Sequence, residues 1–208
     1  LDELITAEGD GSAFFEKTHI TLGMRDLIAE GIARLAGASS QAVFHLKQAM
    51  GGGKTHLLVG FGLLAKHASL RAKYCAGMAH ADAFHGAAIA AFNGRNSPDH
   101  FFWGEIANQL KQGEQFRSFW TSGPKAPDEK DWLNLFDGDQ PVLILLDEMP
   151  PYFHYLDTQK VGNGTVADIT RSIASMPSSA LCGASGTGLA STSASPASST
   201  PASDAAGA

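Results

Sequence analysis

Residues 48 to 56 read Gln48-Ala49-Met50-Gly51-Gly52-Gly53-Lys54-Thr55-His56, and they give the strongest indication of the fold class. A short apolar segment at 42–47 precedes it and predicts a strand, and the apolar spacing over 54–67 predicts a helix after it. A strand, a glycine-rich loop ending in Gly-Lys-Thr and a helix together form the arrangement that binds phosphate groups. The glycines let backbone N–H groups converge on phosphate oxygens, and the helix directs its positive end at the same anion.

The residues of this loop have distinct expected roles. Lys54 would reach the β- and γ-phosphates of a nucleotide, and the Thr55 hydroxyl would bind Mg²⁺. The strict pattern is G-x-x-x-x-G-K-[ST], and Gln48 replaces its first glycine. The alternative for the loop is a glycine-rich turn that a Lys and a Thr follow by chance. The alternative to a role of His56 in the phosphate site is packing or solvent contact. We therefore expect a nucleotide site made by Gly51, Gly52, Gly53, Lys54, Thr55 and His56.

A second motif lies at the end of the clearest strand in the chain, at 141–146. Its residues are apolar on both faces, which is typical of a buried parallel strand, and Asp147-Glu148 follow directly. A buried strand can deliver carboxylates to the carboxyl edge of a sheet, where ligands of α/β proteins bind. Asp147 would then hold Mg²⁺, and Glu148 would act as the general base that polarises the attacking water. The alternative is a strand that ends in two solvated acids.

The rest of the chain divides into three parts. Residues 1–18 form an entry segment, residues 19–177 the core, and residues 178–208 a tail that is almost entirely Ala, Ser, Gly, Thr and Pro. We expect the tail to be disordered because it has too little apolar area to offset the entropy of ordering. The core also contains a strand at 86–92 and further helices, which are predicted at 22–36, from Pro98-Asp99 to about 110, 114–120, 128–136 (with Pro127 at its first position) and 166–176. Pro150-Pro151 is expected to break the chain.

Composition limits the partners and the compartment. The formal net charge of the 208-residue chain is −6, which makes direct electrostatic binding of nucleic acid unfavourable. Two cysteines in no metal-like spacing suit a reducing cytosolic compartment, so we expect a cytoplasmic protein. No apolar run approaches the length of a membrane span, so we expect no membrane partner.

Three blocks of sequence resemble a known family. They are Phe15 to Thr21, the loop Gly51 to His56, and Phe102 to Leu110 followed by Leu145-Leu146-Asp147-Glu148. In these blocks, over about residues 14–177, the chain resembles AAA+-like P-loop ATPases of a bacterial and archaeal family of unknown function. That family is often encoded beside DNA methyltransferases in phage-defence islands.

The resemblance implies a fold and a gap in it. It implies an α/β three-layer P-loop NTPase sheet of the additional-strand type, with strand order 5-1-4-3-2, in which the phosphate-loop strand is 1 and the acidic strand is 3. Strand 4, with its polar sensor residue, would begin after the helix at 166–176, where the low-complexity tail stands instead. Members of the family are also longer. We therefore expect a truncated copy whose sheet is incomplete in its C-terminal half.

Three functions remain open on these grounds. The first is hydrolysis of ATP with Mg²⁺, in the service of a DNA-defence or restriction-like complex, with protein partners or self-association and only indirect contact with DNA. The second is a nucleotide-dependent switch or scaffold without turnover. The third is an inactive fragment that keeps the motifs.

Overall fold

The computed structural model describes residues 11–48, 53–96, 99–123, 125–168 and 188–194. Within these ranges the chain is a mixed α/β protein, and its main sheet is four-stranded and parallel, in the order β1-β6-β3-β2. The strands are β1 (Val43–Gln48), β2 (Ala88–Asn93), β3 (Val142–Asp147) and β6 (Gly188–Ala194). A small antiparallel hairpin is formed by β4 (Lys160–Val161) and β5 (Gly164–Thr165).

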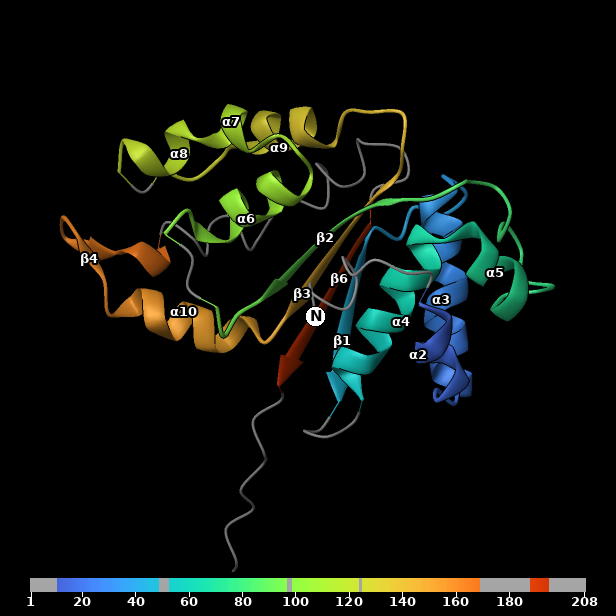
Figure 1. Ribbon diagram of the computed structural model, residues 1–208. Helices are drawn as coiled ribbons and strands as arrows, with labels where there is room; N and C mark the ends of the chain where they lie inside the picture. Colours follow the sequence, from blue (N-terminus) through green and yellow to red (C-terminus); the bar gives the residue numbers. More distant parts are fainter. Residues whose placement is uncertain (1–10, 49–52, 97–98, 124, 169–187, 195–208) are drawn as a thin grey trace, which may run out of the picture.

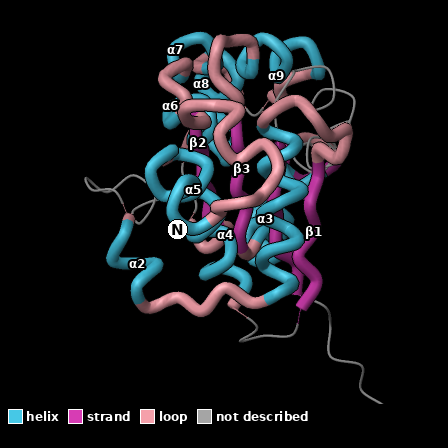
Figure 2. Tube along the Cα trace, turned by 90° about the vertical axis from the view of Figure 1, so that its right-hand side faces the viewer, coloured by secondary structure: helices cyan, strands magenta, loops and turns pink. Residues whose placement is uncertain are grey.

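Helices cover both faces of the sheet, so the described chain has three layers (Figure 1). One face carries α2 (Ser12–Glu16), α3 (Leu22–Leu35), α4 (Lys54–Lys66) and α5 (Ala68–Tyr74). Figure 2 shows α3, α4 and α5 in front of the strands. The other face carries α6 (Phe101–Gln109), α7 (Gly113–Phe116), α8 (Ser118–Thr121), α9 (Glu129–Phe136) and α10 (Met149–Asp157).

Strand β3 joins two hydrophobic cores, one on each face. Val142, Ile144 and Leu146 belong to the core under α6 to α10, and Leu143 and Leu145 belong to the core under α2 to α5. This alternation follows from the period of two in a strand. Every residue of β3 is buried, as expected for a strand of a parallel sheet that is covered on both faces.

Local signals in the sequence explain where α3 begins and ends. The Thr21 hydroxyl accepts a hydrogen bond from the backbone N–H of Met24 at 3.3 Å, so it caps the helix. Gly37 adopts a left-handed φ of 74° just beyond the last turn, a conformation that commonly ends a helix and that glycine favours.

Other local predictions need correction. Pro150 and Pro151 do not break the chain but lie in the first turn of α10, where proline's missing N–H costs nothing. Pro127 is not the first residue of α9, because Asp128 is its N-cap and exchanges hydrogen bonds with Asp131. The helix expected at 114–120 is two short helices, α7 and α8. Of the helix expected at 166–176, residues 166–168 are helical and the others lie outside the described residues.

The expectation of a sheet without its central strand is wrong. Strand β6 lies between β1 and β3 and pairs in parallel with both, so that Leu189 is opposite Val43 and Ile144. These residues belong to the segment 178–208, which we expected to be disordered; the rest of that segment lies outside the described residues. The expectation of disorder considered only the small apolar area of the side chains. A strand between two neighbours also gains backbone hydrogen bonds along both of its edges.

Candidate functional site

The phosphate-loop residues that the structure describes form the start of α4. Gly53 is its N-cap, with a left-handed φ of 72° that glycine adopts at little cost, and its carbonyl accepts the backbone N–H of Leu57 at 2.9 Å. A glycine has no side chain to cap the first turn, and a Cβ built on Gly53 would meet no atom of the described residues within 4 Å. No side chain of Gly53 therefore covers this helix end, where the positive end of the helix dipole lies. Gly51 and Gly52 lie outside the described residues.

Thr55 and Asp147 meet at this helix end although they are far apart in the sequence. The Thr55 hydroxyl donates to Asp147 Oδ2 at 2.6 Å. Asp147 ends β3 and is 2% exposed, and its Oδ1 accepts the backbone N–H of Glu148 at 3.0 Å. The contact therefore brings the two oxygen-bearing side chains expected to bind a metal to one point.

Glu148 is held by Arg95, which follows β2. The Glu148 carboxylate accepts hydrogen bonds from both Nε and Nη2 of Arg95, the latter at 3.0 Å. The two side chains are 37% and 70% exposed, and the carboxylate raises the pKa of Arg95. Such two-point pairing fixes the orientation of the carboxylate.

The backbone around this pair is equally constrained. Glu148 has a left-handed φ of 50°, which is uncommon for a residue with a side chain. Gly94 packs so closely that a Cβ there would collide with the Glu148 carbonyl oxygen. Asn93 Oδ1 accepts the backbone N–H of Arg95 at 3.0 Å. Because Asn93 is opposite Asp147 in the sheet register, the residues that follow β2 and β3 leave the sheet side by side.

His56 faces the entry segment. Its ring stacks on Phe14 with centroids 4.3 Å apart, and its Nε2 lies 2.8 Å from the Thr18 hydroxyl oxygen. The Thr18 hydroxyl itself donates to the Phe14 carbonyl at 2.6 Å, so Nε2 of His56 is the donor in the first contact. The entry segment thus contacts the start of α4, and Phe15 of this segment is buried in the same core as that helix.

Lys54, expected to contact phosphates, is the first residue of α4 and half-buried. Among the described residues, no three His, Cys, Asp or Glu side chains gather as a metal site. A cation at Thr55 and Asp147 would therefore need further ligands such as phosphate oxygens and water, which is how Mg²⁺ binds in nucleotide sites.

Comparison with known proteins finds one family match, over part of this chain. Residues 4–74 match the DUF499 N-terminal domain, an uncharacterised family. The match covers less than half of the chain; it includes the glycine loop and the His56 contacts and ends before β2 and β3. No curated protein and no solved structure matches. None of the helices in the described ranges has the length and apolar character needed to cross a bilayer.

Proposed function

We propose that this chain is a P-loop ATPase that binds ATP with Mg²⁺ and hydrolyses it. The observation that carries the proposal is the 2.6 Å contact from the Thr55 hydroxyl to Asp147. Two motifs that were identified separately thereby meet at the carboxyl edge of a parallel sheet, which is where nucleotides bind in α/β folds. A glycine-rich turn or a pair of solvated acids, each arising by chance, would give no reason for this meeting.

The strand order supports a P-loop NTPase sheet. The family resemblance implies that one strand separates the phosphate-loop strand from the acidic strand and that a further strand lies beyond it. The order β1-β6-β3-β2 has this arrangement, with β1 before the loop and β3 before Asp147. The C-terminal edge of the sheet can therefore hold the loop, the carboxylates and a nucleotide between them.

The chain's own residues fit a magnesium nucleotide. The hydroxyl of Thr55 and the carboxylate of Asp147 are hard oxygen donors, which Mg²⁺ prefers, and the start of α4 is suited to an anion. Mg²⁺, when bound, would supply charge neutralisation for the phosphate oxygens. Lys54 would hold the β- and γ-phosphates from the first turn of α4. Glu148 would orient a water and take up its proton, once its carboxylate is free of Arg95.

The first test is binding of ATP with Mg²⁺ to the full chain, with Lys54→Ala as the variant and Lys130→Ala on α9 as the matched control. We expect saturable binding that Lys54→Ala weakens by roughly tenfold or more and that Lys130→Ala leaves unchanged. Circular dichroism of each variant establishes that it is folded. A folded wild-type chain that does not bind ATP would refute the proposal.

The second test separates binding from turnover. We expect Glu148→Gln to bind ATP with Mg²⁺ as the wild type does. Its rate of phosphate release should be lower than that of the wild type by a factor of roughly 100 or more, because the amide cannot accept the proton of water. Steady-state phosphate release measures this. A Glu148→Gln variant with the wild-type rate would show that another group, or none, acts as the base.

A second function, a nucleotide-dependent switch without turnover, is favoured by one observation. The Glu148 carboxylate is engaged by Arg95, so a base so held is poorly placed to accept a proton from water. ATP binding with no phosphate release above the Lys54→Ala background would support the switch. The inactive-fragment alternative depended on a missing central strand, and β6 occupies that place.

The wider role follows from the resemblance alone. On that basis the ATPase serves a DNA-defence or restriction-like complex in the cytoplasm, and reaches DNA through protein partners or self-association. Co-purification of the tagged chain with a neighbouring DNA methyltransferase, lost in Lys54→Ala, would test this role.

A further inference from the structure

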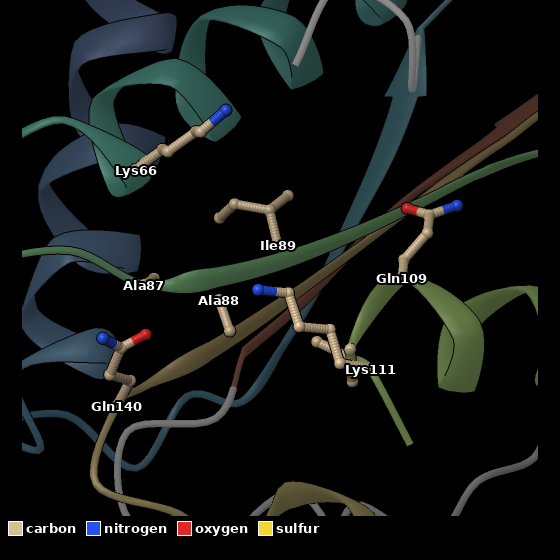
Figure 3. Close-up of a pocket in the computed structure, with 8 residues that line it drawn as sticks. Lys66, Ala87, Ala88, Ile89, Gln109, Lys111 and Gln140 are labelled. Atoms are coloured by element: carbon tan, nitrogen blue, oxygen red, sulfur yellow. The ribbon is translucent and has the colours of Figure 1, made fainter. Parts of the chain in front are cut away.

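A hollow of about 620 Å³ lies along the outer edge of β2 (Figure 3). Its floor is formed by Ala88 and Ile89, and Lys66, Lys111 and Gln140 stand around it. These residues come from the end of α4, the start of β2, the segment after α6 and the segment before β3. The hollow is therefore at the opposite end of the sheet from Thr55 and Asp147 and separate from the candidate nucleotide site.

The backbone at this edge has hydrogen-bonding groups directed away from the sheet. In the described chain β2 pairs with β3 on one side and with no strand on the other. The backbone N–H of Ala88 donates to the Pro141 carbonyl at 2.8 Å, so residues 88, 90 and 92 face β3. In a parallel ladder the intervening residues direct both their N–H and C=O outward. Ile89 and Ala91 are therefore the outward residues.

Ala91 shows what such a residue binds. The side-chain amide of Gln109 accepts the Ala91 N–H at 2.8 Å and donates to the Ala91 carbonyl at 2.9 Å. One carboxamide thus makes the two bonds that a neighbouring strand would make. Ile89 has the same orientation two residues earlier, and no side chain of the described residues makes this contact with it. Its N–H and C=O face the hollow, where a peptide group fits.

The charge around the hollow selects the ligand. Lys66 ends α4 on one face of the sheet, and Lys111 follows α6 on the other face, in a chain whose net charge is −6. Lys111 has a left-handed φ of 62° in the turn where the Gln112 N–H bonds to the Ala107 carbonyl at 2.8 Å. Glycine is usual at this position, so a lysine there carries a conformational cost, and its side chain points toward the start of β2 in Figure 3.

We propose that the edge of β2 at Ile89 binds an extended segment of a partner protein that carries two consecutive acidic residues. Successive side chains of a strand point to opposite faces, so neighbouring carboxylates reach Lys66 on one face and Lys111 on the other. The backbone of the segment pairs with the N–H and C=O of Ile89, as in other cases of strand addition to a sheet edge. The proposal does not depend on nucleotide binding.

The probe is the peptide Thr-Val-Glu-Glu-Val-Thr-amide with fluorescein attached at its N-terminus, titrated with the full chain and followed by fluorescence anisotropy. We expect a Kd on the order of 10–100 µM. Binding should weaken roughly fivefold or more when Glu-Glu of the peptide is replaced by Gln-Gln. The same loss is expected for each of the protein variants Lys66→Gln and Lys111→Gln. The matched charge control Lys160→Gln should have no effect. Absence of binding at about 1 mM protein, or equal loss in Lys160→Gln, overturns the proposal.

Two further measurements test the strand pairing itself. Ile89→Pro removes the outward N–H at an edge strand, where proline is tolerated, together with a partly buried side chain, and should abolish binding. Ile89→Val keeps that N–H and should bind as the wild type does. N-methylation of alternate peptide residues leaves the protein intact, and one alternate set should abolish binding while the other does not. Equal effects of both sets would show purely electrostatic binding and refute strand addition. Self-association that Ile89→Pro removes would identify the occupant as a second copy and refute the partner segment.

Discussion

At the scale of single residues, the carboxyl ends of β1, β3 and β2 bring the candidate site together. The meeting of Thr55 and Asp147 could be anticipated, because a phosphate loop and a buried acidic strand both end at the carboxyl edge of a parallel sheet. The pairing of Arg95 with Glu148 could not, because it depends on the register that sets Asn93 opposite Asp147. A charged residue one or two positions beyond a strand has no sequence pattern that indicates its partner.

Removing the Arg95 side chain should release the candidate base. We expect Arg95→Ala to raise steady-state phosphate release by roughly two- to fivefold, which is the range for loss of one exposed ion pair, and to leave ATP binding unchanged. Arg117→Ala, which removes another exposed arginine that pairs with a glutamate, is the matched control. A fall in rate to the level of Glu148→Gln would instead show that Arg95 is required for turnover.

At the scale of elements, a buried arginine fixes α5 to its surroundings. The Arg71 side chain is fully buried, and its donors bind the carbonyls of Leu64 and Ala65 at the end of α4 and those of Ala81, Phe84 and His85 in the following loop. Burial lowers the pKa of Arg71, but a guanidinium keeps its proton at neutral pH. The sequence of 69–85 has only a weak helical pattern, and nothing in it indicates that a charged residue organises the segment.

We expect Arg71→Lys to lower the free energy of unfolding by about 2–4 kcal/mol. A lysine has fewer donors than the guanidinium and leaves buried carbonyls unsatisfied around a buried charge. The midpoint of urea denaturation measures the change. Lys73→Arg on the exposed side of the same helix should shift the free energy by less than about 0.5 kcal/mol. Equal stability of Arg71→Lys and wild type would show that the carbonyls find other partners.

At the scale of the whole molecule, sequence periodicity was sufficient for the long elements and insufficient for the sheet's centre. The segments of α3, α4 and β3 were predicted to within a few residues because apolar spacing and end residues agree there. Strand β6 was missed because Gly188-Leu189-Ala190-Ser191-Thr192-Ser193-Ala194 has one large apolar side chain. Its place is set by the two strands beside it, which no local pattern reveals.

If β6 completes the sheet, a change in its backbone should affect the whole fold. Leu189→Pro removes an N–H from a strand that pairs on both sides and leaves a buried carbonyl of a neighbour unsatisfied, which costs about 1–3 kcal/mol. We expect a lower urea midpoint and weaker ATP binding together, because β1 and β3, which carry the two halves of the candidate site, are joined through β6. Leu189→Val keeps the N–H and should change neither quantity by a comparable amount. If Leu189→Pro matched the wild type in both measurements, β1 and β3 would have to be held together without β6.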